Sequence, residues 1–246
     1  MVTSMAIKIT STKQVNHYVN CMVYGESGIG KTMLCSTPPA PLILSVEGGL
    51  LTLAEKDVPV IEITKREEIN EVFKWLSKSK EIKYKTICID SLSEVAEVLL
   101  AEEMAVQKDG RQAYGKMAEV MTLLIRSFRD LPMHTVFTAK VRKIVDDNTG
   151  SVKYFPSVPG QQLLNNLPYF FDEVFRMDFG KKKDKTLYRY IDTVGSRQYI
   201  CKDRSNRLAA QEPPNLTHVF NKILNTPKPV AKTTPPSKPS KPQEGK

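Results

Sequence analysis

The chain has 246 residues, of which 41% are hydrophobic and 26% are charged, and its formal net charge is +9 at pH 7. This length and composition suit one sizeable α/β core rather than two small domains, and they exclude a membrane-spanning protein because no apolar run is long enough. Lys8, Lys13 and Gln14 interrupt the N-terminal apolar residues. We therefore expect no signal peptide, no membrane partner and a cytoplasmic location.

The cysteines are widely spaced and form no C-x-x-C pair. This spacing favours reduced core residues over disulfides or zinc ligands. The four cysteines are Cys21, Cys35, Cys88 and Cys201.

The strongest motif is the segment GESGIGKT, which matches the phosphate-loop pattern G-x-x-x-x-G-K-[ST] at every fixed position. Its glycines permit backbone torsions that turn successive N–H groups toward an anion. Lys31 adds a positive charge, and the Thr32 hydroxyl can ligate a magnesium ion that bridges the outer phosphates. The residues predicted to bind the nucleotide are Gly25, Glu26, Ser27, Gly28, Ile29, Gly30, Lys31 and Thr32.

The elements around this loop follow in chain order. Asn20–Tyr24 is predicted to be a strand, and prolines at 38, 39 and 41 should make the helix after the loop unusually short. The unbroken apolar run Leu42–Val46 predicts a strand that is buried on both faces, and it ends at Glu47. A carboxylate at this end of a central strand faces the ligand crevice, so Glu47 is a candidate for orienting the attacking water. A solvated turn glutamate is the equal alternative.

The next two strands bring a second acidic candidate. Val60–Ile63 is a short strand, and Thr64–Glu67 matches a capping box that opens an amphipathic helix. Thr86–Ser91 is an apolar strand that contains Asp90 near its end. A helix cap is the alternative role for Asp90, but beside a phosphate loop we expect it to hold the magnesium ion.

Two helices, which start near Leu92 and Tyr114, lead to a predicted strand at Thr135–Lys140. The segment Val141–Gly160 that follows combines basic residues with adjacent aromatic residues. Such a combination can follow a phosphate backbone while stacking bases, although a hairpin with a solvated face has the same pattern. The DNA-binding candidates are Arg142, Lys143, Lys153, Tyr154 and Phe155.

The rest of the chain predicts hairpins and a tail. Glu173–Met177, Leu187–Ile191 and Gln198–Cys201 are expected to be strands of antiparallel hairpins added to the parallel core. Thr226–Lys246 has five lysines against one glutamate, which gives +4 and leaves +5 for the body, and its proline content predicts a disordered basic arm. We therefore divide the chain into an N-terminal segment (1–18), an ATPase domain (19–225) and a tail (226–246).

This order of elements resembles the RecA-like ATPase core, and most closely the phage nucleotide-binding proteins that act as ATP-dependent single-strand DNA annealing proteins. The resemblance spans Val19 to Leu208. Leu42–Gly49 is similar to the strand with the family's catalytic glutamate, which favours Glu47, and Ile87–Ser91 is similar to its Asp-Ser metal strand. The resemblance implies a RecA-like α/β fold with a mostly parallel sheet flanked by helices, and ATP and Mg²⁺ as cofactors.

The resemblance also implies coupling between sites. Phe137–Lys140 resembles the strand whose last polar residue senses the γ-phosphate, although RecA has glutamine where this chain has Lys140. Lys202-Asp203-Arg204 resembles a Lys-x-Lys pair that reaches a neighbouring subunit's nucleotide, with Arg204 at the second position. A homo-oligomer with shared ATP sites is implied. RecA's N-terminal packing helix and its C-terminal domain have no evident counterpart here, so long filaments are not implied.

The function expected from the sequence is ATP hydrolysis coupled to single-stranded DNA binding in recombination, in the host cytoplasm if the chain is phage-encoded. A single-strand-binding protein is a further partner to consider for the tail. One alternative is a helicase-like motor or replication accessory on the same core. A P-loop kinase is another, which is weakened because no acceptor pocket is evident. Guanine specificity is disfavoured because no N/T-K-x-D motif follows a strand.

Overall fold

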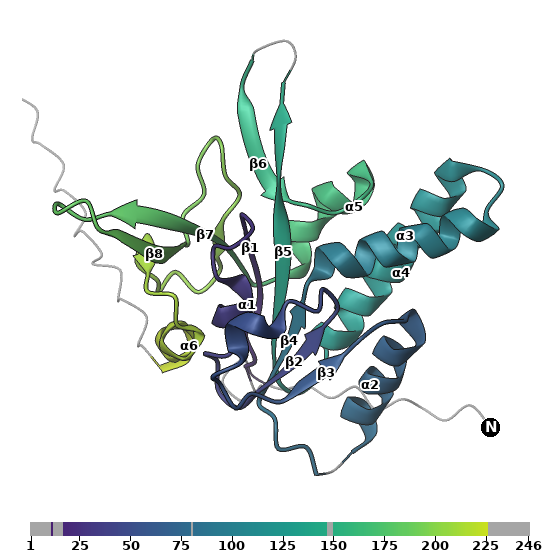
Figure 1. Ribbon diagram of the computed structural model, residues 1–246, viewed down its shortest axis with the longest axis horizontal. Helices are drawn as coiled ribbons and strands as arrows, with labels where there is room; N and C mark the ends of the chain where they lie inside the picture. The colour runs from purple at the N-terminus through teal and green to yellow at the C-terminus, as the bar shows by residue number, and fades with distance from the viewer. Residues whose placement is uncertain (1–10, 12–16, 80, 147–149, 226–246) are drawn as a thin grey trace, which may run out of the picture.

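A ten-stranded, mostly parallel sheet forms the middle layer of the computed structural model, with helices on both of its faces (Figure 1). The structure describes residues 11, 17–79, 81–146 and 150–225. In chain order the strands are β1 (Asn20–Gly25), β2 (Pro41–Ser45), β3 (Val60–Glu62), β4 (Thr86–Asp90), β5 (His134–Val145), β6 (Val152–Pro156), β7 (Glu173–Lys181), β8 (Leu187–Asp192), β9 (Lys202–Asp203) and β10 (Gln211–Glu212). The helices are α1 (Lys31–Leu34), η1 (Leu50–Leu53), α2 (Arg66–Lys78), α3 (Leu92–Val106), α4 (Gly110–Arg129), α5 (Gln161–Asn166), η2 (Leu167–Phe170) and α6 (Leu216–Asn225).

The strand order across the sheet is β10-β8-β7-β1-β5-β4-β2-β3, with β6 paired to β5 and β9 to β7. Strands β3, β2, β4, β5, β1 and β7 are mutually parallel, so their carboxyl ends lie along one edge. Strand β5 separates β1 from β4. The expected α/β fold, with a mostly parallel sheet flanked by helices, is confirmed.

Each face of the sheet has its own core because successive side chains of a strand point to opposite faces. Met22 and Tyr24 of β1 lie in the cluster covered by α2, α3, α4 and α5, whereas Cys21 and Val23 lie in the cluster covered by α1 and α6. All six residues of β1 are buried. The strand before the phosphate loop is therefore anchored on both sides.

Four predicted elements need correction. Strand β7 is part of the parallel sheet, because it pairs with β1 in parallel and only with β8 and β9 in antiparallel fashion. The strand expected at Gln198–Cys201 is replaced by β9, and β5 continues to Val145 instead of ending at Lys140. The cap of α2 uses Glu68, not Glu67: its carboxylate accepts the backbone N–H groups of Thr64 and Lys65 at 2.6 and 3.0 Å.

Helix α6 was absent from the elements expected from sequence. Its apolar residues Leu216, Val219, Phe220 and Ile223 follow the helical repeat, and Asn215 caps it by accepting the His218 N–H at 3.0 Å. Thr37 accepts the Leu216 N–H at 2.9 Å, which fixes α6 beside α1. The division into an N-terminal segment, a domain and a tail stays a prediction, since 1–10, 12–16 and 226–246 lie outside the described residues.

Candidate nucleotide-binding site

The phosphate loop joins β1 to α1 in the strand–loop–helix context that the motif requires. Gly28 and Gly30 have φ of 74° and 105°, a region that favours glycine. Ile29 between them is 2% exposed and packs into the core, so its side chain anchors the loop while Glu26 and Ser27 face solvent. Helix α1 has only four residues, as the prolines predicted.

The amino group of Lys31 lies across the mouth of the loop. It donates to the carbonyl oxygens of Gly25 and Glu26, both at 2.9 Å. Partial burial lowers the pKa of Lys31, against the opposing charges of Asp90 and Glu47. In this structure the Lys31 cation is held by neutral carbonyl oxygens. Phosphate oxygens would be stronger partners, because they carry the opposite charge.

Thr32, Asp90 and Thr138 form one hydrogen-bonded chain from three elements. The Thr32 hydroxyl donates to Asp90 Oδ2 at 2.6 Å, and the Thr138 hydroxyl donates to Asp90 Oδ1. A carboxylate and a hydroxyl are oxygen ligands of the kind that Mg²⁺ takes alongside nucleotide phosphates. The described residues contain no cluster of three or more metal-ligating side chains, so the nucleotide itself would complete the coordination.

Glu47 lies just beyond β2, next to this chain. Its carboxylate accepts a hydrogen bond from the Ser91 hydroxyl at 2.6 Å, and Ser91 directly follows Asp90. The side chain is otherwise exposed. The sequence candidates for water activation and for metal binding therefore lie side by side, as expected for neighbouring parallel strands.

Lys140 extends from β5 toward α3 rather than toward the loop. Its amino group is 2.8 Å from Glu94 and 3.3 Å from Glu97, and the hydrogen bond to Glu94 raises its pKa. The Lys140 backbone N–H also donates to Ser93 at 2.9 Å. In this arrangement the proposed γ-phosphate sensor is paired with two carboxylates, an ion pair that the sequence did not predict.

The family model described as "AAA domain" matches residues 17–205, which include every element of this site. The chain belongs to the AAA domain family. It therefore carries a nucleotide-binding P-loop ATPase domain. No curated protein matches the chain by sequence.

Three solved structures resemble this AAA domain at a distance. A KaiC-like protein of Pyrococcus horikoshii OT3 has 15% identity and a TM-score of 0.41, covering 73% of this chain and 80% of its own. The RadB recombinase has 15% identity and a TM-score of 0.40, covering 72% and 91%. The flagellar accessory protein FlaH of Methanocaldococcus jannaschii has 11% identity and a TM-score of 0.38, covering 74% and 78%.

The predicted DNA-binding residues of the AAA domain lie on the β5–β6 hairpin, which projects from the carboxyl edge of the sheet (Figure 1). Arg142, Lys143 and Lys153 are exposed. Arg142 pairs with Phe155 and Lys143 with Tyr154, so the five residues are divided between the two faces of the hairpin. Both rings have contacts within the chain: Tyr154 stacks on Tyr199 at 4.9 Å, and Phe155 packs against the core.

Lys202 and Arg204 lie at the opposite end of the sheet from the phosphate loop of the AAA domain. Strand β9 pairs with the first residues of β7, which in turn lie beside the start of β1. The Lys202 amino group donates to the carbonyls of Pro168 and Phe171 at 3.2 and 2.5 Å. Arg204 is 2.6 Å from Asp172, and its side chain is 61% exposed. Neither cation lies near this chain's own nucleotide site.

Sequence reasoning did not single out two arginines of β7 and β8, of which Arg189 lies at the phosphate loop. The side chain of Arg189, on β8, lies beside Gly30: its Cδ is 3.5 Å from the position that a Cβ of Gly30 would occupy. Arg176, on β7, lies 3.6 Å from the centre of the Tyr199 ring and pairs with Asp178 and Asp192. No motif marks either residue, because their position depends on the pairing of β7 with β1.

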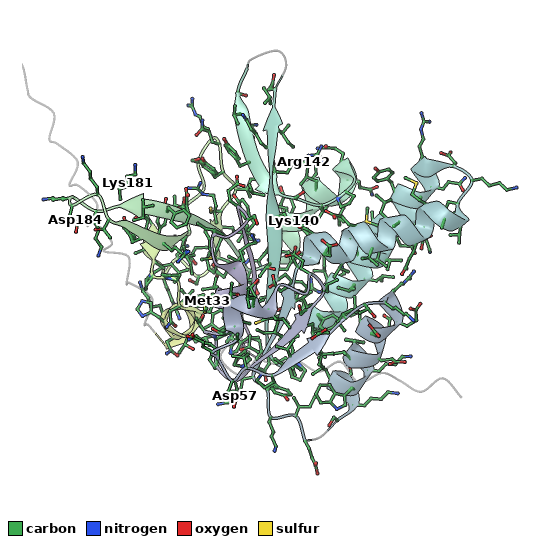
Figure 2. The ribbon with its side chains drawn as sticks, in the orientation of Figure 1. Met33, Asp57, Lys140, Arg142, Lys181 and Asp184 are labelled. Carbon is green, nitrogen blue, oxygen red and sulfur yellow. The ribbon has the colours of Figure 1, made fainter. Side chains whose placement is uncertain are left out.

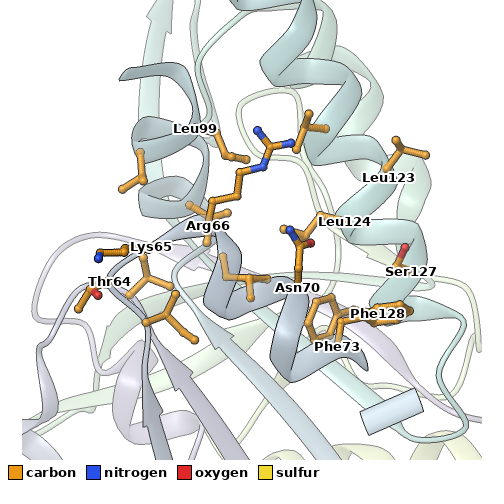
Figure 3. Close-up of a pocket in the computed structure, with 16 residues that line it drawn as sticks. Thr64, Lys65, Arg66, Asn70, Phe73, Leu99, Leu123, Leu124, Ser127 and Phe128 are labelled. Atoms are coloured by element: carbon orange, nitrogen blue, oxygen red, sulfur yellow. The ribbon is translucent and has the colours of Figure 1, made fainter. Parts of the chain in front are cut away.

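An apolar cavity of about 310 Å³ lies apart from the nucleotide site, between α2, α3 and α4 (Figure 3). Phe73, Leu99, Leu124 and Phe128 contribute to its lining, and Val46, which precedes Glu47, borders it. None of the residues assigned to the nucleotide lines it. No helix among the described residues is long and apolar enough to cross a membrane.

Proposed function

We propose that this AAA domain protein hydrolyses ATP and binds single-stranded DNA, and that it acts in recombination, by annealing or strand handling. The observation that carries this proposal is the path of β5. One strand carries Thr138, which donates to Asp90, and farther along it carries the exposed cations Arg142 and Lys143. Figure 2 labels Lys140 and Arg142 on this strand. Nucleotide state and the hairpin are thus joined by continuous backbone.

The chemistry of hydrolysis follows from the side chains at the carboxyl edge. Lys31 and the loop amides bind the phosphates, and the exposed carboxylate of Glu47 accepts a proton from the attacking water while Ser91 holds its other oxygen. Thr32 and Asp90 would hold Mg²⁺, which neutralises phosphate charge when bound. A γ-phosphate competes with Glu94 and Glu97 for the Lys140 amino group, which gives β5 two alternative partners.

The hairpin offers phosphate contacts rather than free stacking platforms. Its three cations are exposed on both faces, whereas Tyr154 and Phe155 are engaged within the chain. We therefore assign backbone contacts to Arg142, Lys143 and Lys153, which bind single strands without regard to sequence. Base stacking by Tyr154 or Phe155 would require these rings to leave their present partners.

Assembly with shared ATP sites is part of the proposal. Arg204 lies at the amino end of the sheet, away from this chain's own phosphate loop, so its exposed guanidinium would act on the nucleotide of a neighbouring subunit. Lys202, whose amino group is bound to two carbonyls, would support this segment instead. Mixing Lys31→Ala subunits with Arg204→Ala subunits should restore part of the hydrolysis that each lacks. A fully active Arg204→Ala protein would overturn the shared site.

The deciding experiment for the proposed function is ATP hydrolysis measured without DNA, with single-stranded DNA and with duplex. Stimulation by single strands, together with annealing of complementary strands, is the expected result. Strand separation with directional movement would make the protein a motor, and phosphoryl transfer to an acceptor without DNA effect would make it a kinase. Hydrolysis that ignores DNA and an absence of single-strand binding would overturn the proposal.

A further inference from the structure

The direction in which ATP lies across the phosphate loop can be read from the sheet order. Glu47 lies just beyond β2, Asp90 ends β4 and Lys140 lies within β5, and these three strands are all on one side of β1. The γ-phosphate must face these groups, since they are where metal binding and water attack take place. The ribose and base therefore extend to the other side of β1, where β7 and β8 lie.

The β7–β8 hairpin presents one of its two faces to the phosphate loop. Met177 and Arg189 both approach Gly30: the Met177 Cε is 3.9 Å and the Arg189 Nε 3.6 Å from the position of an added Cβ. Phe179 pairs with Arg189 across the hairpin and alternates with Met177, so it lies on this same face. The Arg189 guanidinium is 5.3 Å from the centre of the Phe179 ring.

The outer part of this face is exposed. Phe179 is 45% exposed, and Arg189 is also exposed and forms no ion pair among the described residues. Arg176, on the opposite face, has two carboxylates and a tyrosine ring as partners. A structural arginine has its partners in the chain; Arg189 has only the face of an exposed ring.

We propose that Phe179 and Arg189 complete the nucleotide site, with the Phe179 ring stacking on the base and the Arg189 guanidinium contacting the phosphates beside Gly30. This inference rests on the proposed ATP binding and adds which residue contacts the base. An aromatic ring stacks on any nucleobase, because every base has a π-face, while guanidinium pairs strongly with phosphate. The site is thus selective for a nucleoside triphosphate over inorganic phosphate chains, but only weakly selective among bases.

The test compares two probes, Mg²⁺–ATP and Mg²⁺–tripolyphosphate, by calorimetric titration. Phe179→Ala should weaken ATP binding about ten-fold and leave tripolyphosphate binding unchanged, because only ATP carries a base. Arg189→Gln should weaken both probes by about ten-fold. Phe179→Tyr, which keeps the ring, should bind ATP like the wild type.

Leu187→Ala is the matched control, since Leu187 is 56% exposed on the same face but farther along the hairpin. It should leave both affinities unchanged. If the wild type binds ATP but Phe179→Ala and Arg189→Gln do so equally well, the inference is wrong and the ATPase proposal stands. If the wild type binds neither probe, the nucleotide site itself is wrong. Thermal unfolding of each variant verifies that it is folded.

Discussion

The two ends of the parallel strands both gather charged side chains, but they do so differently. At the amino end, Asp203 accepts hydrogen bonds from Ser205, Asn206, Arg207 and Leu208, all within its own turn. At the carboxyl end, partners are exposed or exchangeable, as with Glu47 on Ser91 or Lys140 between two glutamates. A dense charge cluster is therefore a poor marker of a site, whereas charges with replaceable partners are a good one.

Glu173 gives a second indication that the amino end of the sheet has a structural role. It is 2% exposed, and burial together with the nearby charge of Asp203 raises its pKa to about 8. A protonated glutamate at neutral pH is a neutral core residue. The comparison predicts that changes at the carboxyl end affect nucleotide chemistry and that changes at the buried Glu173 affect stability. Arg204 is the exception at the amino end, because its side chain is exposed and is proposed to reach a neighbouring subunit.

The largest effect should come from Lys31→Ala. The substitution removes the cation that the loop supplies to the outer phosphates, so ATP affinity should fall at least about 100-fold. Calorimetric titration with Mg²⁺–ATP measures it, and an unchanged melting temperature shows that the loss is local. Binding at wild-type affinity would mean that the loop does not hold phosphate.

Glu47→Gln should separate binding from turnover. Its ATP affinity should stay near the wild-type value, while the hydrolysis rate falls about 100-fold or more, because the amide cannot accept the water's proton. Ser91→Ala, which releases the Glu47 carboxylate and also removes the N-cap hydrogen bond of α3, should lower the hydrolysis rate about ten-fold at most. Wild-type turnover by Glu47→Gln would remove Glu47 from the mechanism.

The β5–β6 hairpin can be tested by its response to salt. Replacing Arg142, Lys143 and Lys153 together by glutamine should weaken single-strand binding and reduce the slope of log affinity against log salt by about 2, or about 0.7 per phosphate contact. Fluorescence anisotropy with a labelled single strand measures both. An unchanged slope would move the DNA surface elsewhere, and deletion of residues 226–246 then tests the tail.

The smallest effect concerns Glu173 and appears only as a dependence on pH. Folding raises its pKa from 4.5 to about 8, so the native state keeps a proton that the unfolded state loses, and stability falls as the pH rises through this range. The amide introduced by Glu173→Gln does not titrate, so this loss of stability is absent in the variant. Relative to the wild type, it should gain about 1 kcal/mol or more, roughly 2–4 °C, between pH 5 and pH 9.

Melting temperatures at the two pH values provide the measurement. Glu102→Gln, a change at an exposed position of α3, is the control and should show no such gain. A difference between Glu173→Gln and wild type that is the same at both pH values would mean that Glu173 is ionised in the folded protein. The amino end would then hold an uncompensated charge, and the contrast between the two ends would weaken.

The sequence was sufficient where a signal is local. The glycines and Lys31 define the loop, unbroken apolar runs define β2 and β4, and their terminal acids, Glu47 and Asp90, come together because parallel strands end at one edge. It was insufficient where position depends on pairing between distant strands. The parallel pairing of β7 with β1 left no pattern in the chain, so Arg189 beside Gly30 went unpredicted.

The sequence also could not show which partner a charge selects. The resemblance to the RecA-like core suggests a γ-phosphate contact for Lys140, but the glutamates paired with it come from α3, whose docking angle no local pattern specifies. Tyr154 and Phe155 read as free aromatic residues for the same reason. Their contacts with Tyr199 and the core require the folded chain.

The unbroken length of β5 has a mechanical consequence. Strand β5 is fixed by hydrogen bonds at Thr138 and at Lys140. Beyond that point its sheet partner among the described residues is β6, and Val141 and Ile144 pack against the core. From Lys140 to Lys143 it extends about 10 Å, so a tilt of about 10° at its base would move the backbone at Lys143 by about 2 Å. A displacement of this size is most of a hydrogen-bond length. On the proposed function, a change of partner at Lys140 that tilts the strand would therefore be enough to make or break a phosphate contact of Lys143.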